Sequence, residues 1–298
     1  MPEGHTIHRL AQDCQERFAG WRTRVSSPQG KFTDSAALLD GAVLDGTDAH
    51  GKHLFLGFEA RGWVHIHLGL IGKVAFDGPV SDTVRLRLAG GPHGEHTMDL
   101  RGPAACELIT DPEKKALHDR LGPDPLRTPV VNGPAGPAAP VDPADGPDRV
   151  YARMSRSRVS VAALLMDQKV IAGVGNVYRA EVLFRHGVDP FLPGRALPRP
   201  VWDAMWADLV ALMRQGVRNN RIDTVRPEHE PEGAKRDGGP PGRRLGEGRQ
   251  PRKDSHGGEV YVYRRTGQPC LVCGTPVRTR PLAARNLFWC PTCQPPAA

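Results

Sequence analysis

The sequence predicts a multidomain α+β protein: a leading helix, then an antiparallel β-sandwich or barrel, then a helical domain and a metal-stabilised module at the end. Short alternating apolar runs fill the first 126 residues, helical periodicity marks residues 150–216, and four of the six cysteines form two tight pairs near the end. Glycine, aspartate and proline separate the alternating runs, as is typical of antiparallel sheets. A chain of 298 residues can form two or three domains.

The first domain, residues 1–126, begins with apolar side chains at helical spacing, Ile7, Leu10 and Ala11, which predict the leading helix. The runs that follow have the length and alternation of strands. They are Ala42–Leu44, His53–Phe58, Trp63–Leu68, Lys73–Phe76, Thr83–Leu88 and Cys106–Ile109.

Composition divides the rest of the chain into four segments. Residues 127–148 carry six prolines and are expected to form a linker. Residues 149–218 are expected to form a helical domain, and residues 219–258, which are polar, basic and rich in Gly and Pro, a flexible loop. Residues 259–298 contain the paired cysteines.

Three helices and one strand can be predicted within these segments, and one of the helices is Val177–His186, which follows Gly173-Val174-Gly175-Asn176. Val161, Leu164 and Ile171 indicate one buried helical face, and Trp202–Gln215 has apolar side chains three or four residues apart. The apolar run Val260–Tyr263 is typical of a strand.

The charge is unevenly distributed. The chain carries +7 overall, with a net −4 over residues 1–149 and +11 over residues 150–298. A basic half predicts a polyanionic partner, nucleic acid first, and a basic surface kept for solubility is the alternative. We find neither a signal peptide nor a run of about eighteen apolar residues, so we expect no membrane partner and a cytoplasmic location, at the nucleoid if the source is bacterial.

The paired cysteines predict a structural zinc ion. Cys270 and Cys273 are separated from Cys290 and Cys293 by sixteen residues, and each pair has two residues between its members. This spacing lets four thiolates surround one tetrahedral ion and leaves no position open for water. A redox pair is the alternative.

The first three residues, Met1-Pro2-Glu3, offer a nucleophile. The small Pro2 favours removal of Met1, which would leave a secondary amine beside the Glu3 carboxylate. An α-amino group titrates near pH 8 whereas a lysine titrates near about 10.4, so part of it is neutral and nucleophilic at physiological pH. Glu3 could then move protons. An ordinary chain start is the alternative.

Four further residues have both a functional and a structural interpretation. Lys52, before the apolar run 54–56, could contact a phosphate or be a solvated charge. Leu70, between two glycines, could project from a turn and fill the gap left by a flipped nucleotide, or be core. Asn176, after Gly173-Val174-Gly175, could lie at an anion-binding turn or cap a helix. Arg285, between the cysteine pairs, could touch phosphate or be solvated.

Taken together, these residues resemble the formamidopyrimidine-DNA glycosylase/endonuclease VIII family of bifunctional DNA repair enzymes. The matching segments lie in the family's order and reach both ends of the chain. They are Met1-Pro2-Glu3-Gly4, Gly51-Lys52, His67-Leu68-Gly69, Leu121–Leu126, Gly173–Tyr178 and Tyr263–Gln294.

The resemblance implies an N-terminal β-sandwich with a leading helix, a helix-two-turn-helix domain and a zinc-finger β-hairpin. It also implies damaged DNA as the partner of a monomer that needs no organic cofactor. Carried over by position, Pro2 resembles the nucleophile, Glu3 the acid/base partner and Lys52 the phosphate-binding lysine. Asn176 resembles the helix-turn asparagine, and Arg285 the zinc-finger arginine. We group Lys52 and Arg285 with the catalytic residues.

Arg101 is a further candidate, similar in position to an arginine that fills the void in the duplex. The chain departs from the common family opening, because His5-Thr6 stand where relatives have Pro-Glu. A carboxylate that assists lesion handling in relatives is therefore absent, which affects the choice of substrate.

The predicted function is that of a DNA glycosylase with abasic-site lyase activity, acting through an iminium on Pro2 and nicking by β,δ-elimination. Gly4 favours the endonuclease VIII branch and oxidised pyrimidines, with oxidised purines as the alternative. A non-catalytic zinc-finger DNA-binding protein is the alternative from another class, and His5-Thr6 would favour it. The preferred lesion, the strand context and the role of residues 219–258 stay open.

Overall fold

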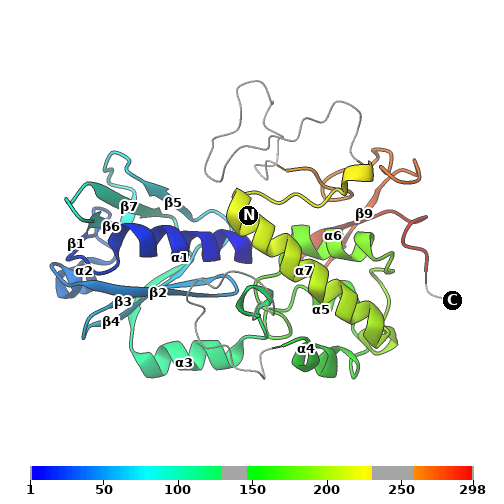
Figure 1. Cartoon of the computed structure of the whole chain (residues 1–298), viewed down its shortest axis with the longest axis horizontal. Coiled ribbons are helices and arrows are strands. Elements are labelled where there is room, and N and C mark those ends of the chain that lie inside the picture. The colour runs from blue at the N-terminus through cyan, green and yellow to red at the C-terminus, as the bar shows by residue number, and fades with distance from the viewer. Residues whose placement is uncertain (1, 129–145, 230–257, 297–298) are drawn as a thin grey trace. The chain divides into compact units, whose positions relative to one another are not determined.

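A computed structural model describes residues 2–128, 146–229 and 258–296, which form two compact units (Figure 1). Unit 1 comprises residues 1–121 and unit 2 residues 122–298. The division falls after Leu121, a few residues before the expected end of the first domain. Of the helices in the described ranges, none combines the length and the apolar character needed to cross a bilayer.

Unit 1 is the predicted antiparallel sandwich, built from two four-stranded sheets. One sheet has the order β1-β6-β7-β5 and the other β2-β3-β4-β8. The strands are β1 (Arg24–Ser26), β2 (Leu44–His50), β3 (His53–Phe58), β4 (Gly62–His67), β5 (Lys73–Phe76), β6 (Val84–Gly90), β7 (His96–Arg101) and β8 (Ala105–Ile109). The helices are α1 (Gly4–Phe18), α2 (Thr33–Leu39) and α3 (Asp111–Arg120).

Helix α1 forms because one face of its sequence is apolar. Ile7, Ala11, Cys14 and Phe18 recur three or four residues apart, and all are buried in a core that both sheets share. Figure 1 shows α1 running along the sandwich. The packing of α1 therefore fixes the position of the residues that precede it.

Unit 2 contains the predicted helical domain. Its α-helices are α4 (Pro147–Met154), α5 (Val161–Leu164), α6 (Asn176–Arg185) and α7 (Arg199–Asn219). The apolar residues predicted to share one face are buried, but α5 ends at Leu164 and Ile171 lies beyond it. The first residues of this unit belong to its core, since Gly122 N donates to Gln168 O at 2.8 Å and Ala172 N donates to Pro123 O at 2.9 Å.

The end of unit 2 is a β-hairpin formed by β9 (Arg278–Leu282) and β10 (Arg285–Trp289), paired in antiparallel register. The predicted strand Val260–Tyr263 is wrong: this segment is buried but forms bends and turns. Most of the expected linker (129–145) and of the expected loop (230–257) lies outside the described residues.

Candidate active site

The N-terminus of unit 1 places a carboxylate at the start of a helix. Glu3 is the N-cap of α1 and is fully buried, and its carbonyl oxygen accepts a hydrogen bond from Thr6 N at 3.0 Å. The positive end of the helix dipole favours an ionised carboxylate there. Pro2 precedes it and is half-buried, whereas Met1 lies outside the described residues. The structure therefore holds Glu3 next to the predicted nucleophile by the packing of α1.

Lys52 lies at the tip of the hairpin between β2 and β3, as the sequence predicted. His50 pairs with His53 in the antiparallel register, so Gly51 and Lys52 form a two-residue turn. Gly51 has φ of 59°, which suits a turn of this kind and a residue without a side chain. Such a turn presents the lysine on a backbone that the sheet holds rigid.

Three histidines line the strands behind this turn. His53 is the cross-strand partner of His67, with ring centroids 4.9 Å apart, and His53 Nδ1 lies 2.8 Å from His65 Nε2. Burial, followed by repulsion from neighbouring histidines, lowers the pKa of His53 to about 3. Burial likewise lowers the pKa of His65 to about 4, and burial together with Lys52 lowers the pKa of His67. All three are therefore neutral at pH 7 and add no positive charge beside Lys52.

The loop between β4 and β5 exposes two apolar side chains. Leu70 is 59% and Ile71 77% exposed, and Gly69 turns the chain with φ of 68°. Leu70 thus projects from a turn, as a residue that fills a gap in DNA must. Ile71 was not among the predicted residues, although its place beside Leu70 between glycines was the available signal.

Arg101 is engaged within its own sheet. Its guanidinium donates to Asp99 Oδ2 at 3.2 Å and to the Pro79 carbonyl at 3.3 Å, and the buried Asp99 also pairs with Arg87. A role in DNA binding would require Arg101 to leave these partners, so that role stays a prediction.

In unit 2, Asn176 joins the helical domain to the zinc-finger hairpin. Gly175 is the N-cap of α6 and Asn176 the first helical residue, so a capping role for Asn176 is wrong. Instead its Nδ2 donates to the Asn286 carbonyl at 3.0 Å. The fully buried Arg179 donates to Asn176 Oδ1 and, at 3.4 Å, to the Asn286 carbonyl. The turn after Gly173 and the hairpin are thus held together.

Arg285 directly follows the tip of that hairpin. The tip residues Ala283 and Ala284 have φ of 52° and 56°, a conformation that alanine adopts only at a cost. Arg285 is half-buried and donates to the Ala284 carbonyl at 2.9 Å. Because Asn286 follows Arg285, the structure brings Arg285 and Asn176 into one region of unit 2.

The four cysteines form a cluster suited to a structural metal. Their sulfur atoms all lie within 4.8 Å of one another, with 3.8 Å between Cys270 and Cys293 and 3.4 Å between Cys273 and Cys290. A tetrahedral site with metal–sulfur bonds of about 2.3 Å has sulfurs about 3.8 Å apart. No disulfide joins these cysteines. The donor set and spacing therefore fit the metal that the sequence predicted.

Comparisons with known proteins agree with this geometry. Family models match residues 1–106 (formamidopyrimidine-DNA glycosylase N-terminal domain), 136–226 (its H2TH domain) and 267–296 (zinc finger found in FPG and IleRS). Endonuclease 8 1 of Mycobacterium tuberculosis is 47% identical over 302 residues, which cover 99% of this chain and all of that protein. The chain belongs to the formamidopyrimidine-DNA glycosylase and endonuclease VIII family. Formamidopyrimidine-DNA glycosylase of Gloeobacter violaceus is 28% identical over 99% of this chain and 96% of its own.

Solved structures of this family share the fold. The MutM (Fpg) protein of Thermus thermophilus matches 98% of both chains with a TM-score of 0.69 and 26% identity. Lactococcus lactis Fpg, solved with DNA that contains an oxidised pyrimidine, matches 99% of this chain and all of its own with a TM-score of 0.71. Its 17% identity supports the fold alone. The predicted order of sandwich, helical domain and zinc-finger hairpin is confirmed.

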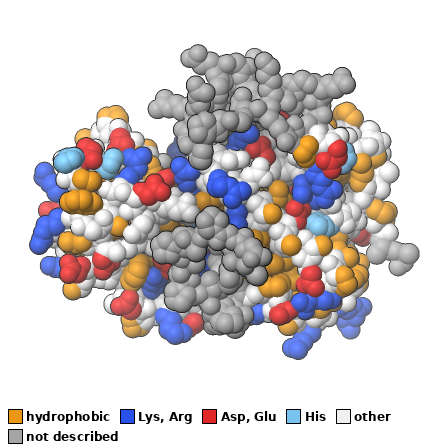
Figure 2. Space-filling view, in the orientation of Figure 1, with side chains coloured by type: hydrophobic (Ala, Val, Ile, Leu, Met, Phe, Trp, Pro, Cys, Tyr) orange, Lys and Arg blue, Asp and Glu red, His pale blue; other side chains and the backbone are white. Residues whose placement is uncertain are grey.

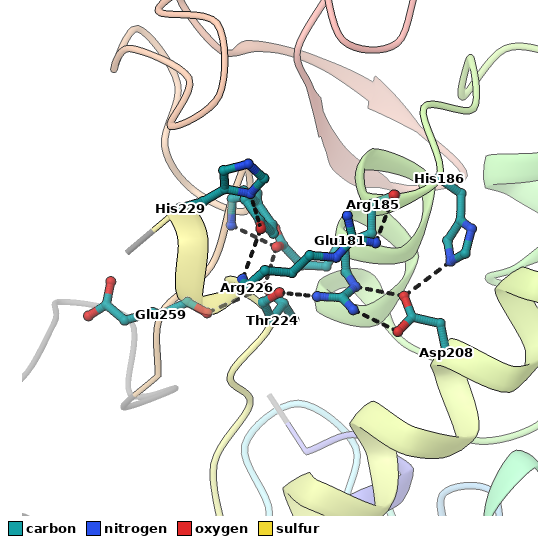
Figure 3. A network of polar contacts seen from close by, with 9 residues as sticks. Glu181, Arg185, His186, Asp208, Thr224, Arg226, His229 and Glu259 are labelled. Atoms are coloured by element: carbon teal, nitrogen blue, oxygen red, sulfur yellow. Dashed lines mark hydrogen bonds and ion pairs between the residues drawn. The ribbon is translucent and has the colours of Figure 1, made fainter. Parts of the chain in front are cut away.

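A buried carboxylate ties the family's helical domain to the segment before the zinc finger. Glu181 Oε1 accepts from the amides of Val262 and Tyr263 at 2.9 Å, and Oε2 accepts from Tyr261 N at 2.7 Å and from the Thr224 hydroxyl at 2.5 Å. These bonds explain why residues 260–263 do not form a strand. Figure 3 shows the surrounding network.

The same network continues to α7. Arg185 donates to both carboxylate oxygens of Asp208, at 2.6 and 2.8 Å, and His186 lies 3.1 Å from one of them. Burial raises the pKa of Asp208, but the hydrogen bonds from His186 and Arg185 outweigh it and hold the pKa at about 2. Asp208 is therefore charged at all physiological pH values and keeps α6 and α7 together.

A surface cavity of about 500 Å³ in unit 1 contains none of the predicted residues. Phe58 and Trp63 contribute to its wall, so it lies at the opposite end of β3 from Lys52. The candidate residues of unit 1 thus lie at the chain terminus, in a hairpin turn and in a loop.

Proposed function

We propose that this member of the family is a DNA glycosylase with abasic-site lyase activity that attacks damaged nucleotides through the nitrogen of Pro2. The observation that carries the proposal is the opening of unit 1, where Pro2 precedes a carboxylate buried at the start of α1. Removal of Met1 frees a secondary amine, partly neutral at pH 7. The 47% identity to endonuclease 8 1 over the whole chain supports it.

The chemistry requires one amine and one proton carrier. The lone pair of the Pro2 nitrogen attacks C1′, and the bond to the base breaks with its electron pair leaving on the base, which takes up a proton. Glu3 takes the proton of the positively charged nitrogen, whose freed lone pair then forms the iminium as the bond from C1′ to the ring oxygen breaks, and Glu3 passes that proton to the oxygen. The iminium acidifies C2′, so successive β and δ eliminations expel the 3′ and 5′ phosphates.

Three side chains are proposed to hold the DNA backbone. Lys52 lies in a hairpin turn, Arg285 directly follows one, and Asn176 is the first residue of α6; side chains at such places can contact phosphates without reading sequence. The neutral histidines behind Lys52 leave the lysine as the cation of its hairpin. Leu70, with Ile71 beside it, is proposed to fill the space of the flipped nucleotide.

Oxidised pyrimidines are the proposed substrates. Gly4 and the similarity to endonuclease 8 1 favour this branch, and oxidised purines are the alternative. We further propose that zinc occupies the four-cysteine cluster, where it would only hold the hairpin in shape, since four thiolates leave no open position. We also propose that the protein acts on DNA as a monomer and that it is located in the cytoplasm.

Borohydride trapping on defined lesion duplexes tests the proposal. The wild-type protein should form a covalent adduct with abasic DNA, mapped by mass spectrometry to the nitrogen of Pro2, and should cleave pyrimidine lesions fastest. Pro2→Leu, whose large second residue disfavours removal of Met1, should form no adduct but bind the duplex normally. Salt-sensitive binding of the wild type without any adduct would instead identify a non-catalytic DNA-binding protein.

A further inference from the structure

Five exposed cations surround a short loop of unit 2 and do not include Asn176 or Arg285. This basic loop patch consists of Arg153, Arg156, Arg158, Lys169 and Arg195. In Figure 2, Lys and Arg side chains gather over the α4 end of unit 2. The patch is part of the basic half of the chain, and none of its residues has a role in the proposed chemistry.

The backbone under the patch is rigid. Arg195 N donates to the Ser157 carbonyl at 2.9 Å, and Gly194 N donates to the Val159 carbonyl at 2.9 Å. A Cβ at Gly194 would lie 2.5 Å from Leu164 Cδ1, which shows how closely the two segments pack. These bonds place Arg195 beside the segment that carries Arg156 and Arg158. The charged groups are therefore displayed on a fixed scaffold, and little backbone order is lost when they bind.

The cations of the patch lack carboxylate partners. Among the described residues, no ion pair forms with any of the five, whereas Arg185, Arg199 and Arg221 of the same unit each pair with an aspartate. Asp167, an exposed acid beside the patch, accepts a hydrogen bond from Lys169 N at 2.9 Å. Unpaired like charges within a Debye length of about 10 Å repel one another, and a polyanion would relieve that repulsion.

The patch is continuous with the turn that carries Asn176. The Arg153 guanidinium donates to the Lys169 carbonyl, and Lys169 follows Gln168. The Gln168 side chain accepts from Gly173 N at 3.1 Å and donates to the Val174 carbonyl at 2.9 Å. One hydrogen-bonded path therefore leads from the patch to the proposed phosphate-binding turn.

We propose that the basic loop patch binds the sugar-phosphate backbone of duplex DNA and extends the contact made at Asn176. The inference rests on the proposed function, from which duplex DNA is taken as the partner of the patch. Residues 153–160 contain no aromatic side chain on which an unpaired base could stack, so the patch suits a duplex better than a single strand. Contacts of this kind carry no sequence information and act through counterion release.

The test is the salt dependence of binding to undamaged duplex DNA. The triple variant Arg156→Gln, Arg158→Gln, Arg195→Gln leaves out Arg153, whose hydrogen bond to Lys169 holds the backbone. Its plot of log affinity against log salt should be shallower than that of the wild type by about 0.9 for each phosphate that the variant no longer neutralises, up to about 2.7. Zinc content and circular dichroism should be unchanged.

A matched control removes the same charge from unit 1. Arg24→Gln, Lys31→Gln, Lys115→Gln changes three exposed cations with no proposed role, and its slope should equal that of the wild type. An unchanged slope in the patch variant, an equally reduced slope in the control, or a reduction seen with duplex RNA but not with DNA would each overturn the proposal.

Adduct formation separates this inference from the proposed function. At saturating abasic DNA, the patch variant should be trapped by borohydride as fully as the wild type, because none of its changes touches Pro2 or Glu3. Failure of the wild type to form an adduct would refute the proposed chemistry. The role of the patch would still be tested independently, because its test measures binding to undamaged duplex DNA.

Discussion

Glu3 is fully buried at the start of α1, so its carboxylate does not serve as a solvated surface charge. Its burial therefore favours a role in proton transfer. Glu3→Gln preserves the shape of the side chain and removes its proton. We expect base excision to fall by about 10²- to 10⁴-fold. Trapping at a preformed abasic site should fall less, because an abasic sugar is partly open as an aldehyde, with which Pro2 forms the iminium without proton transfer to the ring oxygen.

Glu16→Gln on the same helix is the matched control, because Glu16 is exposed. Single-turnover rates on a lesion duplex and on an abasic duplex measure both steps. Equal losses on the two substrates in Glu3→Gln would show that Glu3 acts through structure or binding and not as the proton carrier in ring opening.

His53, which directly follows Lys52, makes the stability of unit 1 depend on pH. Its pKa is about 3 in the folded protein, against 6.5 for a free histidine, so the unfolded chain binds more protons between these values. The free energy of unfolding of unit 1 should therefore fall as pH drops from 7, by roughly 3 kcal/mol at pH 4 from this residue alone. Urea unfolding at a series of pH values measures the slope.

His53→Gln should flatten that slope, whereas His93→Gln, which changes an exposed histidine, should leave it as in the wild type. A pH dependence that survives in His53→Gln would mean that other groups cause it. His65 and His67 contribute in the same direction, because burial lowers both of their pKa values.

Among single residues, the sequence predicted those that stand at turns and missed those that are buried. Lys52 and Leu70 were recognised because glycines flank them. Arg179 was missed, since an arginine on a helix is ordinarily solvated, yet it is fully buried and holds Asn176 against the hairpin. Only tertiary packing could show that.

At the scale of elements, α6 acts as a tether between three parts of unit 2. Its Glu181 binds residues 261–263 and Thr224, and its Arg185 binds Asp208 of α7 (Figure 3). Glu181→Gln replaces an acceptor oxygen with an amide that faces backbone N–H groups. We expect unit 2 to lose about 2–4 kcal/mol of stability, because hydrogen bonds to a buried charge are lost and donors are left unpaired.

Glu228→Gln is the control for that change, since Glu228 is exposed in the same unit. Chemical unfolding can be followed by tryptophan fluorescence, to which the buried Trp202 and Trp206 of unit 2 contribute. A stability of Glu181→Gln within about 0.5 kcal/mol of the control, the usual range for surface changes, would contradict the tether.

Some strands were predicted with the correct bounds and others were missed, and the sequence explains both outcomes. The bounds of β3 and β5 agree with the sequence, because apolar runs between turns mark them. The strand β7 was missed, since His96, Thr97 and Asp99 interrupt its apolar pattern, and the buried Asp99 is explained by its pairing with Arg87 and Arg101. Residues 260–263 were predicted to form a strand because they are apolar. Their apolar character reflects burial in the core of unit 2 and not strand pairing.

At the scale of the whole molecule, the two units have separate cores. The zinc-finger hairpin belongs to unit 2, where the buried Gln294 donates to the Val188 carbonyl at 3.0 Å and accepts from Cys290 N at 3.0 Å. The four-cysteine cluster is thereby joined to the helical domain. Loss of the metal should consequently disturb one unit only.

Cys290→Ser tests this independence. A serine is a poor zinc ligand, and structural zinc sites contribute directly to folding, so the variant should lose its zinc and its affinity for duplex DNA. Unit 1 should stay folded, because its core contains no residue of the hairpin. Atomic absorption measures the zinc, and limited proteolysis with mass spectrometry should recover an intact fragment near residues 2–121. Cys106→Ala, which removes a buried thiol of unit 1, should keep its zinc, and a zinc content in Cys290→Ser equal to that of Cys106→Ala would refute the proposed site.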